Sequence, residues 1–287
     1  MSKTWLITGS SRGLGRELAE AVLAAGHRLV ATARRPDQLD DLVERYGERV
    51  RAVALDVTDA AAARAAVRSA VDAFGSLDVV VNNAGYADVA SIEDFAEADF
   101  RAQIDANFYG VVHVSRAALP ILRAQGGGHI VQISSVGGRV GGAGLGAYQA
   151  AKWAVGGFSE VLAKEVAAFG VKVTVIEPGG LRTNWAGSSM NTPPISDAYK
   201  PVIEPVVERM RKADGAQSGD PARAAQVIIR ITEVDDPPVR LLLGSDAVRV
   251  AAAMAEGLAS SDATWREVSE SIDFATGHVA EAGGARG

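Results

Sequence analysis

Short runs of Val, Ile and Leu recur along the chain and alternate with longer stretches whose apolar residues follow a helical period. Apolar runs without regular polar positions are typical of strands that are buried on both faces of a sheet. The alternation predicts an α/β fold in which one doubly wound, seven-stranded parallel sheet has helices on both faces. The predicted strands are Thr4–Thr8, Arg28–Ala33, Val50–Leu55, Leu77–Asn82, His129–Ser134, Val171–Glu177 and Val239–Leu243.

The stretches between these strands predict the helices. They are 14–26, 37–46, 59–74, 97–124, 147–169 and 220–233. No linker rich in Pro and Ser interrupts the alternation before Asn184. We therefore predict a single domain over 1–245 rather than two smaller ones.

Two regions depart from the alternation. Residues 184–219 are rich in Pro, Gly and Ser around a helical pattern at Ser196–Lys212, and we interpret them as a substrate lid inserted into the domain. Residues 246–287 follow the last strand and form a C-terminal extension. Its predicted parts are helices at 246–256 and 262–273 and a loose end at Glu281–Gly287.

The composition narrows the classes of partner. The chain has 287 residues, of which 48% are hydrophobic, and its 29 basic and 35 acidic residues leave a net charge of -6. Such a chain has no broad positive field, so we expect neither a nucleic-acid partner nor a membrane partner. We find neither a secretory signal nor a run of about 18 apolar residues, and we expect a cytoplasmic protein.

Two residue types limit the chemistry further. The chain contains no Cys, which excludes disulfides, a thiolate nucleophile and cysteine-bound metal clusters. Its histidines, His27, His113, His129 and His278, are scattered and lack the spacing that would place two imidazoles on one helical face. We expect no metal held by the protein.

A glycine-rich turn, Thr8–Gly15, follows the first predicted strand and leads into a helix. Glycines lack a Cβ and let a pyrophosphate approach the backbone amides at a helix N-terminus. The spacing departs from the GxGxxG pattern because Leu18 takes the place of its third glycine. The position in an alternating chain nevertheless predicts a dinucleotide site. The predicted residues are Gly9, Ser11, Arg12, Gly13, Leu14 and Gly15.

The end of the second predicted strand indicates which dinucleotide is bound. An acidic residue at this point binds the ribose 2′-hydroxyl of NAD, but here the strand is followed by Arg34 and Arg35. A guanidinium offers paired donors to the 2′-phosphate of NADP, and Arg12 offers a second cation. The pattern predicts NADP (NADPH), with NAD less favoured. Asp37 follows closely in the sequence and could still reach the ribose 2′-hydroxyl of NAD.

A tyrosine and a lysine lie four residues apart, at Tyr148 and Lys152, and therefore share one face of a predicted helix. An ammonium beside a phenol favours the phenolate, by about two pKa units at an effective dielectric constant of about 20. This predicts that Tyr148 acts as an acid or base near neutral pH. Ser135 follows the fifth strand, on the edge of the sheet that faces the ligand crevice.

Together these motifs resemble the short-chain dehydrogenase/reductase family, in its subgroup of simple single-domain enzymes with a Rossmann-type fold. The resemblance runs from Lys3 to about Thr183. The motifs, in order, are Thr8–Gly15 as TGxxxGxG, Asp56-Val57, Asn82-Asn83-Ala84-Gly85, Asn107, Ser135, Tyr148-x-x-x-Lys152 and Pro178-Gly179 with Thr183.

The resemblance implies a role for each matching position. Tyr148 would be the general acid/base, Lys152 would lower its pKa and bind the nicotinamide ribose, and Ser135 would orient the substrate oxygen. The resemblance also implies that Asn107 holds a water next to Lys152. The implied cofactor contacts are Asp56 and Val57 at the adenine, Asn83, Ala84 and Gly85 at its ribose, Pro178, Gly179, Leu181 and Thr183 at the nicotinamide, and Arg34 with Arg12 at the 2′-phosphate.

The resulting hypothesis is an NADP-dependent oxidoreductase that transfers a hydride between the cofactor and a carbonyl or secondary alcohol. The alternatives are a dinucleotide sensor without chemistry and an isomerase or dehydratase that oxidises its substrate transiently. The lid side chains favour an apolar substrate, although they could also pack against the lid's own helix or another subunit. They are Trp185, Met190, Ile195 and Tyr199.

The resemblance further implies a homodimer or homotetramer, because members of this family commonly associate through the two long helices predicted at 97–124 and 147–169. Trp153 or Phe158, which lie on the second of these helices, could face such an interface.

Overall fold

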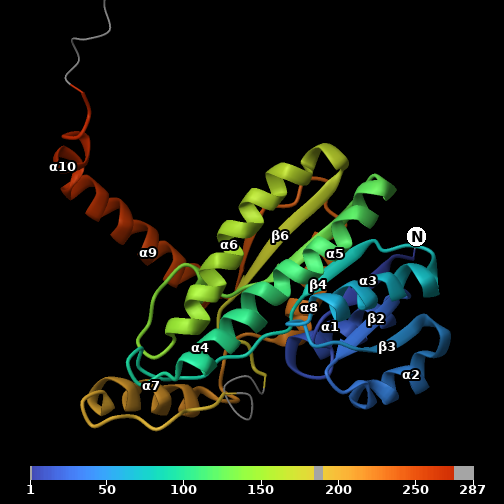
Figure 1. Ribbon diagram of the computed structural model, residues 1–287, viewed down its shortest axis with the longest axis horizontal. Helices are drawn as coiled ribbons and strands as arrows, with labels where there is room; N and C mark the ends of the chain where they lie inside the picture. The colour runs from blue at the N-terminus through green and yellow to red at the C-terminus, as the bar shows by residue number, and fades with distance from the viewer. Residues whose placement is uncertain (1, 184–189, 275–287) are drawn as a thin grey trace, which may run out of the picture.

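The computed structural model describes residues 2–183 and 190–274, and its centre is one parallel sheet of seven strands (Figure 1). The strands run in the order β3-β2-β1-β4-β5-β6-β7, which confirms the predicted doubly wound α/β fold. Each predicted strand is present, with ends that differ by two residues at most. The strands are β1 Thr4–Ile7, β2 Arg28–Ala33, β3 Val50–Ala54, β4 Val79–Asn82, β5 Gly128–Ile133, β6 Val171–Pro178 and β7 Arg240–Leu243.

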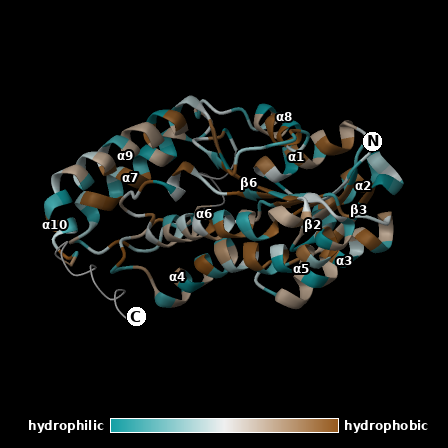
Figure 2. Ribbon diagram, turned by 90° about the horizontal axis from the view of Figure 1, so that it is seen from above, coloured by the Kyte–Doolittle hydropathy of each residue, from teal (hydrophilic) through white to brown (hydrophobic). Residues whose placement is uncertain are grey.

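Helices cover both faces of this sheet, as Figure 2 shows. One apolar core lies between the strands and α1, α2 and α8, and a second lies between the strands and α3, α5 and α6. Alternate residues of β1 divide between the two cores, since Trp5 and Ile7 face the first and Leu6 the second. The helices are α1 Gly13–Ala24, α2 Asp40–Tyr46, α3 Ala60–Phe74, α4 Glu97–Ile104, α5 Gly110–Gln125, α6 Gly146–Val166, α7 Lys200–Ala213, α8 Pro221–Ile231, α9 Ser245–Thr264 and α10 Arg266–Glu270.

The strand order reverses between β1 and β4, which both pair in parallel with their neighbours. In such sheets the crevice for ligands lies outside the carboxyl ends of the strands at this reversal. The segments that follow β1, β4, β5 and β6 meet there, and they carry most of the residues that the motifs single out.

The long helix predicted at 97–124 is two helices, α4 and α5, joined by the π-helical turn Asp105–Tyr109. Apolar periodicity could not reveal this turn, because it adds a residue to one helical turn without introducing Gly or Pro. Asn107 lies in the turn and is fully buried. Turns of this type are frequent at functional sites.

The C-terminal extension also differs from its prediction. The two helices expected at 246–256 and 262–273 are one long helix, α9, followed by the short α10. Gly257 lies at the expected break, but the surrounding Ala-rich sequence propagates the helix through it. Only Ala247 and Ala251 of α9 are buried, and the rest of α9 projects from the body of the protein with α10 (Figure 1).

The lid helix predicted at Ser196–Lys212 is α7, which begins four residues later because Pro201 marks its first turn. The lid residues Asn184 and Trp185 and the predicted loose end Glu281–Gly287 lie outside the described residues. Across the described part of the chain, no helix is both long and apolar enough to span a bilayer.

Candidate active site

The turn after β1 is built around three glycines. Gly9 and Gly13 have positive φ angles of 69° and 55°, which favour glycine. Gly15 has no room for a side chain, because a Cβ there would overlap the carbonyl oxygen of Gly9 and the side-chain amide of Asn83. Helix α1 begins at Gly13, and its N-cap residue Arg12 makes no capping hydrogen bond with its side chain. The first amides of α1 are therefore not capped by that side chain, as expected where a phosphate binds.

The end of β4 holds this turn in place. The side-chain amide of Asn83 donates hydrogen bonds to the carbonyl oxygens of Thr8 and Gly9, at 2.9 and 3.1 Å. The hydroxyl of Thr8 accepts from the backbone amides of Asn83 and Ala84, at 2.9 and 3.0 Å. Thr8 therefore links two segments that lie 75 residues apart, a role that its position before the glycines could have suggested.

Tyr148 and Lys152 lie on the first turns of α6 and are 8% and 4% exposed. The Nζ atom of Lys152 is 5.7 Å from the centre of the Tyr148 ring. It donates a hydrogen bond of 2.8 Å to the carbonyl oxygen of Ile133, the last residue of β5. The i, i+4 spacing thus brings the phenol and the amine together as predicted.

Burial determines the charge state of both side chains. It raises the pKa of Tyr148 to about 12, although the hydrogen bond with Ser135 acts in the opposite direction. It lowers the pKa of Lys152 to about 8. The prediction that Lys152 lowers the pKa of Tyr148 is therefore wrong, because the low-dielectric surroundings disfavour the phenolate.

Asn107 approaches the same centre from the π-helical turn. Its amide nitrogen donates to the carbonyl oxygens of Tyr86 and Gln103, both at 2.9 Å. Its Oδ1 atom is buried without a hydrogen-bond partner among the described residues. A Cβ on Gly85 would overlap this oxygen and lie 3.6 Å from Nζ of Lys152, so Gly85 lies against both groups. A buried acceptor without a partner is a position where a bound water is expected.

Ser135 follows β5 and caps the 3₁₀ turn Val136–Gly138, accepting a hydrogen bond of 3.0 Å from the amide of Gly137. The glycine-rich loop beyond this turn is held by Gln149, whose Oε1 accepts from the amide of Gly142 at 2.6 Å. Ser135, Tyr148 and the loop therefore lie close together beyond the carboxyl end of β5.

The turn after β6 approaches the glycine turn of β1. A Cβ on Gly13 would lie 3.6 Å from the Cβ of Thr183. The amide of Gly179 donates to the carbonyl oxygen of Leu243, and that of Gly180 donates to a carboxylate oxygen of Asp246, at 2.9 and 2.8 Å. Asp246 belongs to the predicted C-terminal extension, and its role in supporting this turn was missed.

Three other predicted cofactor residues follow the carboxyl ends of β2 and β3. Arg34 is exposed after β2, and Asp56 is exposed after β3, where it accepts hydrogen bonds from the backbone and hydroxyl of Thr58. Val57 is buried against Gly110. The remaining predicted cofactor residues lie in segments that are described above. They are Ser11 and Leu14 in the glycine turn, Pro178 at the end of β6 and Leu181 beyond it.

The segment predicted as a lid packs in an apolar cluster that it shares with residues outside it. Val89, Ile203 and Val207 are buried there, and Met190, Ile195 and Tyr199 pack against them with Leu145. The sequence left open whether these lid residues face a substrate or the lid's helix, and the described contacts include the helix. Trp185, the fourth predicted lid residue, lies outside the described residues.

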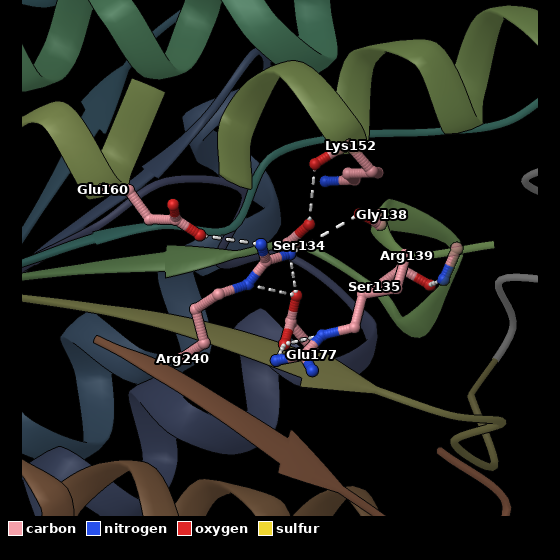
Figure 3. Close-up of polar contacts among 9 residues, drawn as sticks. Ser134, Ser135, Gly138, Arg139, Lys152, Glu160, Glu177 and Arg240 are labelled. Carbon is pink, nitrogen blue, oxygen red and sulfur yellow. Dashed lines mark hydrogen bonds and ion pairs between the residues drawn. The ribbon is translucent and has the colours of Figure 1, made fainter. Parts of the chain in front are cut away.

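A buried ion-pair network lies behind the crevice and was also missed (Figure 3). Glu177 is fully buried at the end of β6 and binds two arginines, Arg139 and Arg240. Arg139 Nε lies 2.8 Å from its Oε2, and Arg240 Nε lies 3.0 Å from its Oε1. Arg240 also binds Glu160 on α6, at 2.9 Å. The available sequence signal was a carboxylate that follows two apolar residues, Val175 and Ile176, just before Pro178-Gly179.

Comparison with known proteins gives a consistent result. A family model described as short chain dehydrogenase matches residues 3–193. Oxidoreductase BOA17 of Botryotinia fuckeliana is 54% identical over 270 residues, covering 94% of this chain and 98% of that protein. The 3-ketodihydrosphingosine reductase of Bacteroides thetaiotaomicron is 32% identical, with 83% and 87% covered. A crystal structure of a short-chain dehydrogenase from Streptomyces avermitilis has a TM-score of 0.90 at 38% identity, with 96% and 100% covered.

Proposed function

The chain belongs to the short-chain dehydrogenase family of NAD(P)-dependent oxidoreductases, and from this premise we propose that it reduces a carbonyl compound with NADPH. The observation that carries the proposal is the grouping of Ser135 with the buried Tyr148 and Lys152, which combines two hydroxyls with an amine. The reverse of the proposed reduction is the oxidation of a secondary alcohol. The relative named as a ketone reductase supports reduction as the direction.

The crevice fits a dinucleotide. The turn after β1 requires glycine at three positions, because Gly9 and Gly13 have positive φ angles and Gly15 has no room for a side chain. Such a turn leaves its backbone amides open to a pyrophosphate. When bound, the nicotinamide ring supplies or accepts the hydride at its C4 atom. The residues proposed to hold it are Gly9, Ser11, Arg12, Gly13, Leu14, Gly15, Arg34, Asp56, Val57, Asn83, Ala84, Gly85, Lys152, Pro178, Gly179, Leu181 and Thr183.

The proposed mechanism assigns one task to each polar group of the site. Ser135 and Tyr148 donate hydrogen bonds to the carbonyl oxygen of the substrate, and the Tyr148 hydroxyl gives its proton to the developing alkoxide. The Lys152 ammonium stabilises the phenolate that remains. A water on Oδ1 of Asn107, which has no hydrogen-bond partner in the described part of the chain, then connects Lys152 with solvent.

The direct test is a panel of ketones, aldehydes and secondary alcohols, followed by nicotinamide absorbance with NADPH and NADH. We expect stoichiometric consumption of NADPH with at least one carbonyl class. Tight cofactor binding without turnover of any substrate would favour the sensor instead. Conversion of a substrate without net consumption of NADPH would favour an isomerase or dehydratase.

We expect Arg34 to determine the preference for NADPH. Replacing it with aspartate should lower the ratio of kcat/KM for NADPH over NADH by about 10- to 100-fold, because a hydrogen-bonded charge contributes about 1.5–3 kcal/mol. The same kinetics on Arg35→Asp, which changes the adjacent exposed arginine, serve as the matched control. An unchanged ratio in Arg34→Asp, or a larger change in the control, would contradict the assignment.

The rate of reduction should depend on the charge of Lys152. Because its pKa is about 12, Tyr148 stays protonated at neutral pH and is available as the proton donor. Lys152 instead loses its charge as the pH rises through about 8. We expect kcat for reduction to be constant at lower pH and to fall about tenfold per unit at higher pH. A profile from about pH 6 to about pH 10 tests this. A rate that increases across this range would contradict the assigned role of Lys152.

Three further predictions concern the rest of the chain. An apolar substrate under the lid is supported by the apolar surroundings of Met190 and Ile195. A homodimer or homotetramer through α5 and α6 is supported by Trp153, whose side chain is 48% exposed. The division into a catalytic domain over 1–245, with its lid, and an extension over 246–287 stays a prediction.

A further inference from the structure

Glu177, which the proposed mechanism does not use, joins four parts of the structure around the crevice. We infer that the Arg139–Glu177–Arg240 network positions Ser135 for the reaction and that Glu177 is its central positioning residue. This inference rests on the proposed function, because it assigns the network an effect on how the substrate carbonyl is held.

The network reaches Ser135 through one short turn. The amide of Gly138 donates to the carbonyl oxygen of Ser135 at 2.8 Å, and the amide of Arg139 donates to that of Val136 at 2.9 Å. Arg139 therefore ends the 3₁₀ turn that Ser135 caps, and its side chain binds Glu177. Movement of Arg139 would be transmitted to Ser135 over a single turn of backbone.

The same network contacts the helix that carries Tyr148 and Lys152. A Cβ on Gly138 would lie 2.8 Å from the carbonyl oxygen of Lys152, so the 3₁₀ turn packs directly on that helix. The hydroxyl of Ser134 donates to the same oxygen at 3.2 Å (Figure 3). Further along α6, a Cβ on Gly156 would lie 2.9 Å from the Arg240 guanidinium, which fills the space that this glycine leaves.

Glu177 directly precedes Pro178 and Gly179, but the turn after β6 is held separately, since the amide of Gly179 donates to the carbonyl oxygen of Leu243. A fully buried carboxylate is stable only when its partners satisfy both oxygens, as the two arginines do here. A well-packed apolar group often stabilises a fold as well as a buried ion pair does. We therefore assign the network to the geometry of the crevice rather than to stability alone.

The test compares Glu177→Gln and Arg139→Met with the parent enzyme. We expect kcat for the carbonyl substrate to fall about 10- to 100-fold in both variants, because a displacement of about 1 Å has effects of this size. The Kd for NADPH should change less than about twofold, since neither side chain belongs to the proposed cofactor contacts. Arg139→Lys should restore part of the rate, and the double variant should be no slower than the slower single variant.

Thr174→Val is the matched structural control. Thr174 lies on the same strand, is fully buried, and loses hydrogen bonds to His129 and to the carbonyl oxygen of Pro238 on substitution. It should lower the melting temperature without changing kcat. Parent-like kcat in Glu177→Gln and Arg139→Met, or an equal loss of kcat in Thr174→Val, would overturn the positioning role.

Amide hydrogen exchange separates this inference from the proposed function. In Glu177→Gln, exchange should become faster at the amides of Gly137, Gly138 and Arg139 and stay unchanged in α3, whether or not the substrate panel finds an activity. Unchanged exchange at these amides would overturn the inference. An inactive parent enzyme with the expected exchange pattern would contradict the proposed function and leave the network in place.

Discussion

Replacing Tyr148 with phenylalanine is expected to lower kcat for the carbonyl substrate by about 10²- to 10⁴-fold, the range that a positioned proton donor contributes. The variant removes one hydroxyl and keeps the ring, which is buried beside Lys152. Packing should therefore be retained, while the developing alkoxide loses its proton donor. Steady-state kinetics with NADPH and the best carbonyl of the panel measure the effect.

Cofactor binding provides the internal check on this variant. The Kd for NADPH should stay within about threefold of the parent value, because the proposed cofactor contacts do not include the Tyr148 hydroxyl. Tyr46→Phe is the matched control, since Tyr46 ends α2 and stacks with Arg45 and Arg49 away from the crevice. A Tyr148→Phe enzyme that reduced carbonyls at the parent rate would contradict the proposed acid.

The order of the fold could be read from the sequence because its signals are local. Each strand is a short apolar run, and parallel strands that are separated by helices leave few alternatives for their arrangement. The residues at the crevice were predictable for the same reason. Ser135 follows a strand, and Tyr148 and Lys152 are related by the helical repeat alone.

The supports of the site were not predictable in this way, because they join residues that are distant in the chain. Glu177 binds Arg139 and Arg240, which lie 38 and 63 residues away, and Gly180 binds Asp246, 66 residues away. No periodicity connects these positions. A sheet in which β6 lies between β5 and β7 brings them together.

The charge of Tyr148 shows a different limit. Its distance from Lys152 follows from the helical repeat, but the sign of its pKa shift depends on burial, which arises from elements throughout the chain. The same burial lowers the pKa of Lys152. Sequence spacing therefore predicted the pair correctly and the direction of the tyrosine shift wrongly.

Replacing Gly15 with alanine is expected to disrupt the glycine turn and the cofactor site together. The added methyl group would overlap the carbonyl oxygen of Gly9 and the amide of Asn83. The Gly9 oxygen is backbone and cannot rotate away, and the Asn83 amide is held by hydrogen bonds to Thr8 and Gly9. Either the turn or the start of α1 must move, which typically costs about 1–3 kcal/mol of unfolding free energy.

Such a movement displaces the amides that are proposed to bind the pyrophosphate, so the Kd for NADPH should rise by at least about tenfold. Thermal unfolding and a cofactor titration measure the two effects. Gly257→Ala is the matched control, because a Cβ at this position in α9 meets no other atom within 4 Å. That variant should be neutral or more stable by about 0.5–1 kcal/mol, as for alanine in place of glycine within a helix. A Gly15→Ala variant with the parent's melting temperature and cofactor affinity would contradict the prediction. The close contact of this turn with Asn83 would then not determine cofactor binding.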